Sequence, residues 1–448
     1  MLKWLYPGMR MKRWGFLALF GLLILMLGAA VSIESRQYEV FPLPYRVAQW
    51  VIKHIHIGVS PGVLGAGMIV CGAFLGIFAL LAMMRSVAIV LEPELSAGEL
   101  VDVIYRRRKL AQGKRIVVIG GGTGLSTMLR GLKQYTSNIT AIVTVADDGG
   151  SSGKLKRQLN ILPPGDIRNC LVALADDETQ MTDLFQFRFG SSVNPELKKN
   201  VASASELNSL SLNYGEGLRD HAFGNLLIAA MCAINQGDFQ KAVKETSRVL
   251  NIRGTVLPTT VTHVHLRGEM EDGTFEEGES NIAHSPKKIK RISMVPENAC
   301  PLPEVLEAIQ NAELIVMGPG SVYTSIIPNL LVSGVSNALR QSKAKKVYIC
   351  NVMTQPGETD GFSAFDHVRA IEKHAKMKVF DFVLVNKERP KSQLMEKYDR
   401  YHSVLVEPDT DRIKSEGYRP IAGDFINQTD VVRHDANKLA RAIMKLLG

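Results

Sequence analysis

The sequence contains few cysteines. Its 448 residues include only 5 Cys, and no two of them form a CxxC pair. An odd number of isolated thiols supplies neither a disulfide framework nor the paired ligands of a structural zinc site. We therefore expect small buried thiols in a reduced compartment.

Most of the chain also lacks an excess of basic residues. Lys and Arg exceed Asp and Glu by 53 − 44 = 9. Residues 1–113 hold 12 basic and 6 acidic side chains, whereas residues 114–448 hold 41 and 38, an excess of only 41 − 38 = 3. Proteins that bind nucleic acid concentrate positive charge on the folded domain. The distribution therefore predicts no nucleic acid as a partner.

Two long stretches near the N-terminus carry no charge at all. The first covers residues 14–33, and the second lies within residues 57–84. A helix of about 20 apolar residues crosses a bilayer core of ~30 Å. The sequence therefore predicts two transmembrane spans, at about 14–33 and 61–84. The spacing of Gly72 and Gly76 is typical of helices that approach each other closely.

Basic residues flank these spans on their outer sides. Four precede the first span within residues 1–13, and the block Arg106–Lys109 follows the second, while the intervening loop has three basic and two acidic residues. The positive-inside rule then places both termini in the cytoplasm. An alternative is cleavage by signal peptidase near Ala30–Ser32, after which the second span still leaves the following domain inside. We expect a multi-pass cell-membrane protein whose main domain is cytoplasmic.

The predicted organisation is a membrane hairpin with a basic linker (1–113), followed by a nucleotide-binding domain (114–448). The basic end of the linker has two interpretations. In the first, it contacts anionic lipid head groups, and each basic residue contributes about 1 kcal/mol of binding free energy. In the second, it only sets the orientation of the hairpin. The sequence favours the second interpretation.

The domain opens with a strand, a glycine loop and a helix. Residues 115–119 are an apolar run, GGGTG follows at 120–124, and residues 125–132 have helical apolar spacing. Free N–H groups at a helix start attract phosphate, and glycines permit close approach. The full GxGxxG pattern is absent, because its third glycine falls on Leu125. A tight structural turn is the alternative. The candidate ligands are Gly121, Gly122, Thr123 and Gly124.

A second strand, residues 139–146, ends in the sequence DDGGSSG at 147–153. Two acids at the carboxyl end of a parallel strand are placed to bind ribose hydroxyls, or a metal such as Mg²⁺ that holds phosphates. The following Gly and Ser residues offer donors to an anion. The candidate ligands are Asp147, Asp148, Gly149 and Ser151, with Asp147 and Asp148 as the metal ligands if a metal is bound.

Two further motifs open apolar helices. In PPGDIRN, Asp166 is placed as a helix N-cap, whereas Arg168 and Asn169 are predicted to face the ligand. In HAFGN, Asn225 begins the next helix. Residues 255–295 alternate around Gly-containing turns and predict an antiparallel insertion. The histidines there lack the spacing of metal ligands.

The parallel pattern resumes at residues 312–317, a strand that ends in GPGSVYTS. This second phosphate-type loop supplies five candidates: Gly318, Gly320, Ser321, Tyr323 and Thr324. The ring of Tyr323 is predicted to cover a uracil or sugar, with core packing as the alternative. A further strand leads into NVMTQPGET at 351–359. We expect an α/β fold, a Rossmann-like doubly wound parallel sheet with a small antiparallel insertion, preceded by a two-helix transmembrane hairpin.

These motifs stand in a fixed order over about 115–365, and together they resemble the YvcK-like gluconeogenesis factors within the broader CofD-like (2-phospho-L-lactate transferase) family. The motifs are GGGTG, DDGGSSG, PPGDIRN, GN, GPGSVYTSIIPNLL and NVMTQPGET. The resemblance implies a UDP-sugar or another nucleotide as ligand, and a role in cell shape and cell-wall synthesis on gluconeogenic carbon. It implies cell-wall synthesis proteins as partners, and we also expect a homo-oligomer.

Two functions stay open. The first is a regulator that binds a nucleotide sugar. The second is an enzyme that transfers a phospho-linked group from a nucleotide donor to an acceptor alcohol, by positioning and charge stabilisation. No Ser/His/Asp nucleophile is visible in the sequence, which counts only weakly against a transferase. The resemblance favours the regulator. A purely structural membrane anchor would not need the crevice of a doubly wound sheet.

Overall fold

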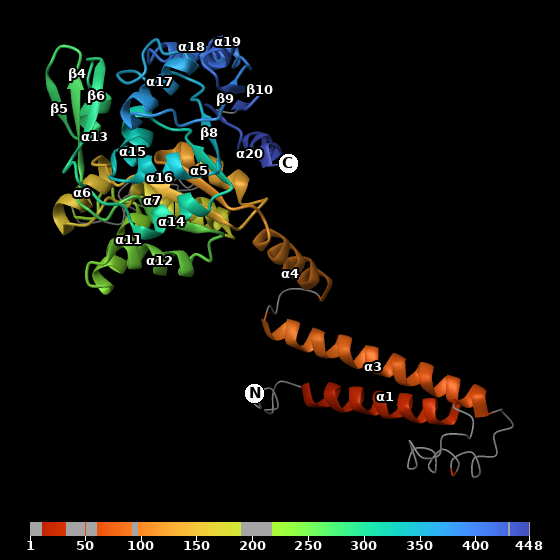
Figure 1. Cartoon of the computed structure of the whole chain (residues 1–448). Coiled ribbons are helices and arrows are strands. Elements are labelled where there is room, and N and C mark those ends of the chain that lie inside the picture. Colours follow the sequence, from red (N-terminus) through yellow and green to blue (C-terminus); the bar gives the residue numbers. More distant parts are fainter. Residues whose placement is uncertain are drawn as a thin grey trace, which may run out of the picture. The chain divides into compact units, whose positions relative to one another are not determined.

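The computed structural model describes residues 11–32, 50, 61–91, 97–189, 217–428 and 431–447. The chain divides into two compact units, Met1–Arg108 and Lys109–Gly448 (Figure 1). Helix α4 (Ala97–Ala111) contains the boundary between them.

Two long helices, α1 (Met11–Ser32) and α3 (Pro61–Leu91), form the first unit. Both are long and apolar enough to cross a membrane, with a mean hydropathy of 2.4 in their most apolar windows. They overlap the predicted spans, and α3 continues seven residues beyond Met84. Most side chains in these windows are not buried within the protein. Their length and composition suit a bilayer, which hides apolar side chains as a protein core does.

The two helices are antiparallel and meet through glycines. A Cβ on Gly28 would lie 2.8 Å from the carbonyl oxygen of Gly65, and a Cβ on Gly72 would lie 2.5 Å from the nitrogen of Leu25. A Cβ on Gly76 would meet nothing within 4 Å. The backbone of α3 nevertheless approaches α1 closely at Gly65, Gly72 and Gly76. A Cβ on Gly21 of α1 would lie 2.8 Å from the nitrogen of Gly76 and 3.0 Å from the carbonyl oxygen of Gly72, so the predicted Gly72–Gly76 spacing does lie at the helix contact.

The second unit is built on a parallel sheet of seven strands in the order β3-β2-β1-β7-β8-β9-β10, and every pairing is parallel. This confirms the predicted α/β fold. The chain order reverses between β1 and β7, where open α/β sheets bind ligands. The strands are β1 (Ile116–Gly120), β2 (Ile139–Val143), β3 (Thr255–Pro258), β7 (Leu314–Met317), β8 (Lys345–Ile349), β9 (Phe382–Asn386) and β10 (Arg419–Gly423).

Helices connect and cover these strands. Ile119, Val118 and their neighbours in β1 are fully buried, as in sheets that are covered on both faces. The helices of the first half are α5 (Gly122–Leu132), α6 (Gly150–Leu159), α7 (Gly165–Leu174), α8 (Glu178–Gln186), α11 (Phe223–Ile234) and α12 (Phe239–Val249). Those of the second half are α14 (Pro303–Asn311), η2 (Val322–Ile326), α15 (Ile327–Leu331), α16 (Val335–Gln341), α17 (Ala364–Ala375), α18 (Ser392–Asp399), α19 (Thr410–Ser415), α20 (Ala436–Met444) and η3 (Lys445–Leu447).

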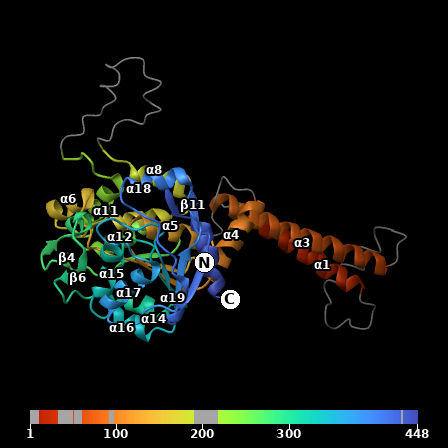
Figure 2. The ribbon, with the colours of Figure 1, turned by 90° about the horizontal axis from the view of Figure 1, so that it is seen from above.

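The antiparallel insertion is smaller than predicted. Strands β4 (His265–Met270), β5 (Phe275–Glu277) and β6 (Ile289–Val295) form a three-stranded sheet with the short helix α13 (Glu279–His284). Figures 1 and 2 show it at the side of the domain. The start of the predicted insertion, β3, belongs instead to the parallel sheet beside β2. A second small hairpin, β11 (Ile426–Gln428) with β12 (Val432–His434), lies near the C-terminus and was not predicted.

Strand β2 ends three residues before its apolar run does. Val145 and Ala146 are each 1% exposed, so they are as buried as the strand itself. They nevertheless follow the strand as loop, because they belong to no described strand pairing while their side chains fill the core. Apolar periodicity reports burial and not pairing, and it therefore overestimates such a strand.

Candidate functional site

A cavity of about 280 Å³ lies at the carboxyl ends of β1, β7 and β8. Both glycine loops line it, and so do three segments from farther along the chain. Four predicted ligands are among its walls: Thr123, Gly124, Gly320 and Ser321. The other lining residues are Thr127, Pro319, Asn351, Val352, Met353, Gln355, Tyr398, Val432, Arg433 and His434.

The first glycine loop serves both the fold and the site. Gly122 has a φ of +67°, a conformation that other residues rarely adopt. A Cβ on Gly121 would lie 2.6 Å from Oδ2 of Asp166, and one on Gly124 would lie 2.8 Å from the carbonyl carbon of Pro319. The glycines therefore let neighbouring loops approach, as a structural turn requires. Thr123 and Gly124 still line the cavity at the start of α5, where unpaired N–H groups favour an anion.

The second loop is held by a carboxylate that sequence reasoning missed. Glu358 accepts hydrogen bonds from the hydroxyl of Ser321 and, at 3.3 Å, from the hydroxyl of Thr324. Burial raises the pKa of Glu358. Asn351, at the end of β8, accepts from Gly320 N at 3.1 Å and donates to its carbonyl at 2.8 Å. Both residues belong to the NVMTQPGET motif, and the polar Asn and Glu of that motif are the sequence feature from which they could have been predicted.

Tyr323 lies outside the glycine-loop cavity. It is 4% exposed, and its ring meets Phe362 and His374 edge to face. It lines a separate cavity of about 610 Å³ together with residues of α17 and β6. Burial raises its pKa to about 12, and its N–H donates to Glu358 at 3.3 Å.

The aromatic ring in the glycine-loop cavity is Tyr398 of α18. Its hydroxyl accepts from the N–H of Val432 at 3.0 Å and donates to the carbonyl of the same residue at 3.3 Å, so β12 fixes the ring. Beside it lie Arg433, which is exposed, and His434, which is half-buried. Burial lowers the pKa of His434 to about 4, and its Nε2 has no partner among the described residues. No local pattern could have found these residues, because they lie some 300 positions from the first loop.

The acids predicted beside the second strand form part of a half-buried acidic cluster. Asp147 accepts from Gly149 N at 2.9 Å, and burial raises its pKa. Asp148 is turned toward the insertion, where it accepts from the N–H and hydroxyl of Ser280 at 2.9 and 2.7 Å. Glu279 joins the cluster, and burial raises its pKa well above the usual value.

Asp166 is the centre of this cluster and not a helix N-cap. Helix α7 begins at Gly165, its N-cap is Pro164, and the carboxylate of Asp166 accepts from the backbone of Gly122. Burial, and then the charge of Asp147, raise its pKa to about 7. The predicted N-cap is therefore wrong, because the N-cap is Pro164, two residues earlier, and the side chain of Asp166 points at the first glycine loop.

Next to the cluster lies a buried polar network that joins four predicted ligands, Ser151, Arg168, Asn169 and Asn225, with His221, which was not predicted as a site residue. Oγ of Ser151 is 3.0 Å from Nδ1 of His221, and Asn225 Nδ2 donates to the same oxygen at 3.0 Å. Arg168 is 7% exposed and donates to Asn169, yet its Nε and Nη1 have no partner among the described residues. The side-chain amide oxygen of Asn225, Oδ1, also has no hydrogen-bond partner among the described residues. Buried orphan donors and acceptors of this kind are expected where a ligand completes the hydrogen bonds.

The carboxylates of the acidic cluster can supply only some of the ligands that a metal ion needs. Among the described residues, no group of three or more His, Cys, Asp or Glu has the arrangement of a metal site. Asp148 already accepts two hydrogen bonds from Ser280, which leaves Asp147 and Asp166 as the carboxylates near the glycine loop. Magnesium is commonly held by one or two carboxylates together with substrate phosphates. These residues would fit the ion in that way, with the ligand supplying the remaining oxygens.

Comparisons with known proteins agree with this architecture. The family profile described as 2-phospho-L-lactate transferase CofD matches residues 116–426. The chain therefore belongs to the CofD family. Within that family it is similar to the gluconeogenesis factor of Bacillus subtilis, with 46% identity over 75% of this chain and 99% of that protein.

Two further relatives separate the parts of the chain. A Nostoc sp. protein provisionally named gluconeogenesis factor is 42% identical over 100% of this chain and 92% of its own length. A crystal structure of a UPF0052-family protein from Bacillus halodurans is 47% identical, with a TM-score of 0.66 over 74% of this chain and 99% of that chain. The α/β domain thus exists as a complete chain by itself, and the N-terminal unit occurs in only some relatives.

Proposed function

We propose that the domain binds a nucleotide sugar, a UDP-sugar, and acts as a regulator that links carbon metabolism to cell shape and cell-wall synthesis. One observation carries the binding part: two glycine loops, a fixed tyrosine ring and an arginine line one cavity at the switch point of the sheet. The choice of uridine, and the role in the cell wall, rest on the resemblance to gluconeogenesis factors.

The cavity walls suggest how the ligand lies. Its volume of about 280 Å³ suits a nucleoside with part of its phosphates. The ring of Tyr398 covers the base, since aromatic rings stack on bases at about 1–3 kcal/mol each. The phosphates lie on Thr123–Gly124 and Gly320–Ser321, with Arg433 as the cation. The sugar then extends toward the buried donors of Arg168.

A second candidate function is the transferase, which the pair of Ser151 and His221 favours. A serine hydroxyl at 3.0 Å from an imidazole nitrogen is an arrangement that activates nucleophiles. Desolvation lowers the pKa of His221, which keeps the imidazole neutral and able to accept a proton. Both residues are buried, however, and a bound ligand would have to reach them past Arg168.

The experiment replaces the ring that covers the base. Tyr398→Ala should weaken UDP-glucose binding about tenfold or more in calorimetry, because stacking is lost. Tyr398→Phe should retain most of the affinity. Tyr401→Ala, which removes a tyrosine that is 68% exposed, is the matched control and should bind normally. Equal affinity of Tyr398→Ala and the native protein, with unchanged melting, would contradict the proposed site.

The same sample separates regulator from transferase. After long incubation with Mg²⁺ and acceptor alcohols, a regulator returns UDP-glucose unchanged. Release of UDP that depends on Ser151 or Asp147 would establish the transferase instead.

We propose further that α1 and α3 cross the cell membrane and leave the α/β domain in the cytoplasm. The basic residues before α1 and after α3 support this orientation. A reporter fused to Gly448 that is active only in the cytoplasm should be active. Activity of a periplasmic reporter at the same position would refute the orientation.

A further inference from the structure

The amino-terminal edge of the parallel sheet carries a second, basic hollow. Because all seven strands are parallel, the starts of β8, β9 and β10 lie at the edge opposite the glycine loops. A cavity of about 620 Å³ opens there. Six cationic side chains line it: Arg340, Lys343, Lys345, Lys346, Lys378 and Arg419.

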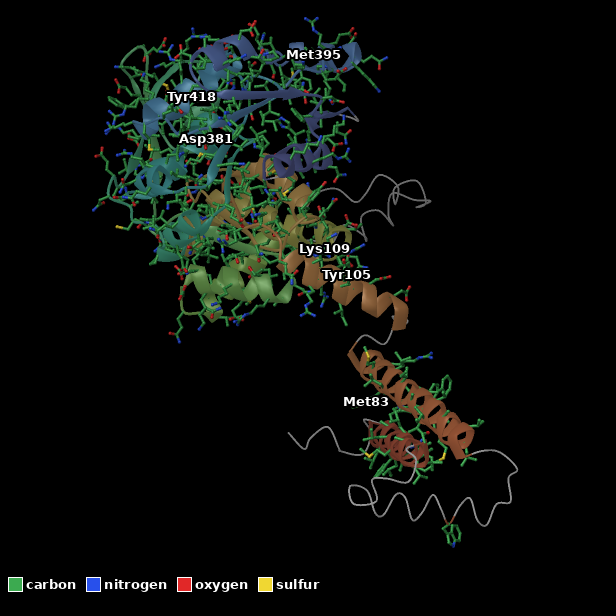
Figure 3. All side chains as sticks on the ribbon, turned by 45° about the vertical axis from the view of Figure 1, so that its right-hand side comes forward. Met83, Tyr105, Lys109, Asp381, Met395 and Tyr418 are labelled. Atoms are coloured by element: carbon green, nitrogen blue, oxygen red, sulfur yellow. The ribbon has the colours of Figure 1, made fainter. Side chains whose placement is uncertain are left out.

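These cations have almost no acidic partners. Among the described residues, Asp381 is the only carboxylate that lines the hollow, and it accepts a hydrogen bond from the backbone N–H of Lys346 at 2.8 Å. The ammonium groups of Lys345 and Lys378 donate to backbone carbonyls, at 2.6 and 2.9 Å. Within the described part of the chain, no ion pair involves any of the six. Figure 3 labels Asp381 on this half of the domain.

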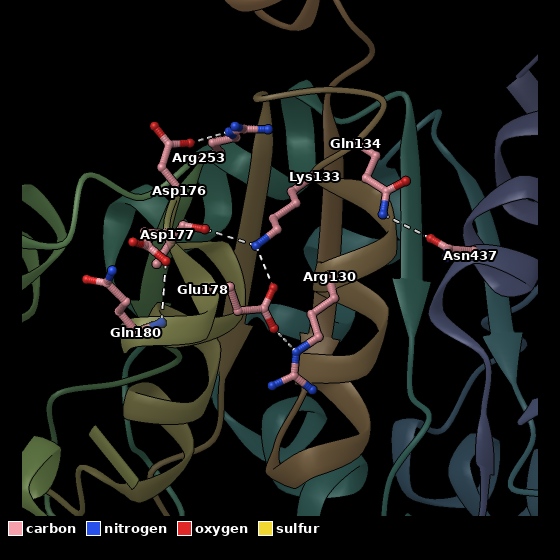
Figure 4. A network of polar contacts seen from close by, with 10 residues as sticks. Arg130, Lys133, Gln134, Asp176, Asp177, Glu178, Gln180, Arg253 and Asn437 are labelled. Atoms are coloured by element: carbon pink, nitrogen blue, oxygen red, sulfur yellow. Dashed lines mark hydrogen bonds and ion pairs between the residues drawn. The ribbon is translucent and has the colours of Figure 1, made fainter. Parts of the chain in front are cut away.

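The other half of the same edge is built differently. There Glu178 pairs with Arg130 and, at 2.7 Å, with Lys133 (Figure 4). Asp176 pairs with Arg253, just before β3 begins. The fold therefore neutralises cations at one half of the edge and leaves them unpaired around the hollow. Six cations against one acid give the hollow an excess of 6 − 1 = 5 positive charges.

The hollow lies on the edge at which the chain enters the domain. Ile116 of β1 pairs with Leu314 of β7, which pairs with Lys345 of β8. Lys114 and Arg115 directly precede this row. The hairpin that is apolar enough to cross a membrane is joined to the domain at this same edge through the chain preceding Lys114. An anionic membrane surface is therefore the source of phosphate that the connectivity brings nearest to the hollow.

We propose that this hollow binds the phosphate groups of anionic lipid head groups and so docks the amino-terminal edge of the domain on the membrane. Lysine and arginine near an anionic surface each contribute attraction that salt screens within a Debye length. The glycine loops, at the opposite edge, then face the cytoplasm and stay open to a soluble ligand. The proposal does not depend on which ligand the glycine loops bind.

The test uses residues 109–448, which correspond to relatives that exist as complete chains. This domain should sediment with phosphatidylcholine vesicles that contain phosphatidylglycerol, and should not sediment with pure phosphatidylcholine. The double variant Arg340→Glu/Lys343→Glu should bind about 30-fold more weakly, at about fivefold for each lost cation. Both side chains are exposed and form no ion pair with the residues that the structure describes, so the variant should melt like the native domain.

The matched control is Lys241→Glu/Arg389→Glu, which changes the net charge equally at exposed positions outside the hollow. It should keep nearly native binding to the vesicles, and a loss equal to that of the first variant would refute a localised site. Pyrophosphate in calorimetry provides the second arm. Binding of pyrophosphate that the first variant abolishes, without vesicle binding, would replace the lipid with a soluble phosphate compound. Failure of the native domain to bind anionic vesicles at low salt would overturn the proposal.

Discussion

The two edges of the parallel sheet carry side chains of opposite charge, and these side chains differ in how exposed they are to solvent. At the carboxyl edge, the half-buried Asp147, Asp166 and Glu279 lie together, and desolvation raises the pKa of each. At the amino edge, the cations around the hollow of β8–β10 are mostly exposed and form no ion pair with any carboxylate that the structure describes. Buried like charges shift toward the neutral form, whereas exposed ones remain charged and attract ions of opposite sign.

This difference fits the ligands that we propose. A half-buried, partly protonated cluster beside glycine loops offers hydrogen bonds of defined geometry, which selects one small molecule. An open basic hollow offers attraction with little geometric selection, which suits a membrane surface. A substitution at one edge should therefore change binding at that edge and leave binding at the other edge unchanged.

The largest effect on binding is expected from Gly122→Asp at the carboxyl edge. The new carboxylate would stand beside Asp166 and the phosphate position, at a residue whose φ is +67°. We expect UDP-glucose binding to fall at least ~100-fold in calorimetry, from charge repulsion and steric exclusion. Binding to anionic vesicles at the amino edge should not change.

Gly122→Asn is the control, because Asn tolerates a positive φ and carries no charge. It should lose less affinity than Gly122→Asp. If the fold is intact and both variants bind UDP-glucose normally, the first glycine loop is only a structural turn.

Asp166→Asn should change the stability of the domain and its pH dependence. The unfolded chain ionises this carboxyl near pH 3.9, and the folded domain near pH 7. Between these values the folded state holds the extra proton, so the free energy of unfolding falls as pH rises from about 4 to 7 and then stays level. At pH 8 the ionised Asp166 therefore lowers the free energy of unfolding of the native domain by up to about 4 kcal/mol. Asp166→Asn should restore this stability. Urea unfolding at pH 5 and pH 8 measures the difference.

The gain from Asp166→Asn should be larger at pH 8 than at pH 5. Asn169→Ala, in the same turn of α7, leaves the carboxyl in place and should keep the native pH dependence. A gain from Asp166→Asn that is the same at both pH values would show that Asp166 is ionised throughout. The carboxyl edge would then hold like charges in the charged form, as the amino edge does.

The fold was largely predictable from local patterns. The apolar run before GGGTG and its helical continuation after Leu125 correspond to β1 and α5, and the run before GPGS corresponds to β7. These segments are buried on both sides, so their composition alone distinguishes them. The insertion was misplaced at its start, because β3 resembles an isolated strand in sequence and pairs with β2 only in the tertiary structure.

The candidate site was predictable only where it is local. Thr123 and Gly320 lie in glycine loops that the sequence displays, and both line the cavity. Tyr398 and Arg433 line it too, but nothing near them in the chain marks them. Tyr323 follows a glycine loop and is nevertheless buried against α17, because η2 turns its ring away from that cavity.

The sequence by itself determined the elements, the glycine loops, the family resemblance and the two apolar stretches, because each depends on neighbouring residues and on their periodicity. The tertiary structure alone decided which charges meet. Residues 114–448 have nearly equal numbers of acids and bases, yet folding collects acids at one edge of the sheet and leaves cations unpaired at the other. Composition sums charge over the chain, whereas a pKa and an electrostatic field depend on the distances that only the packed strands and helices fix.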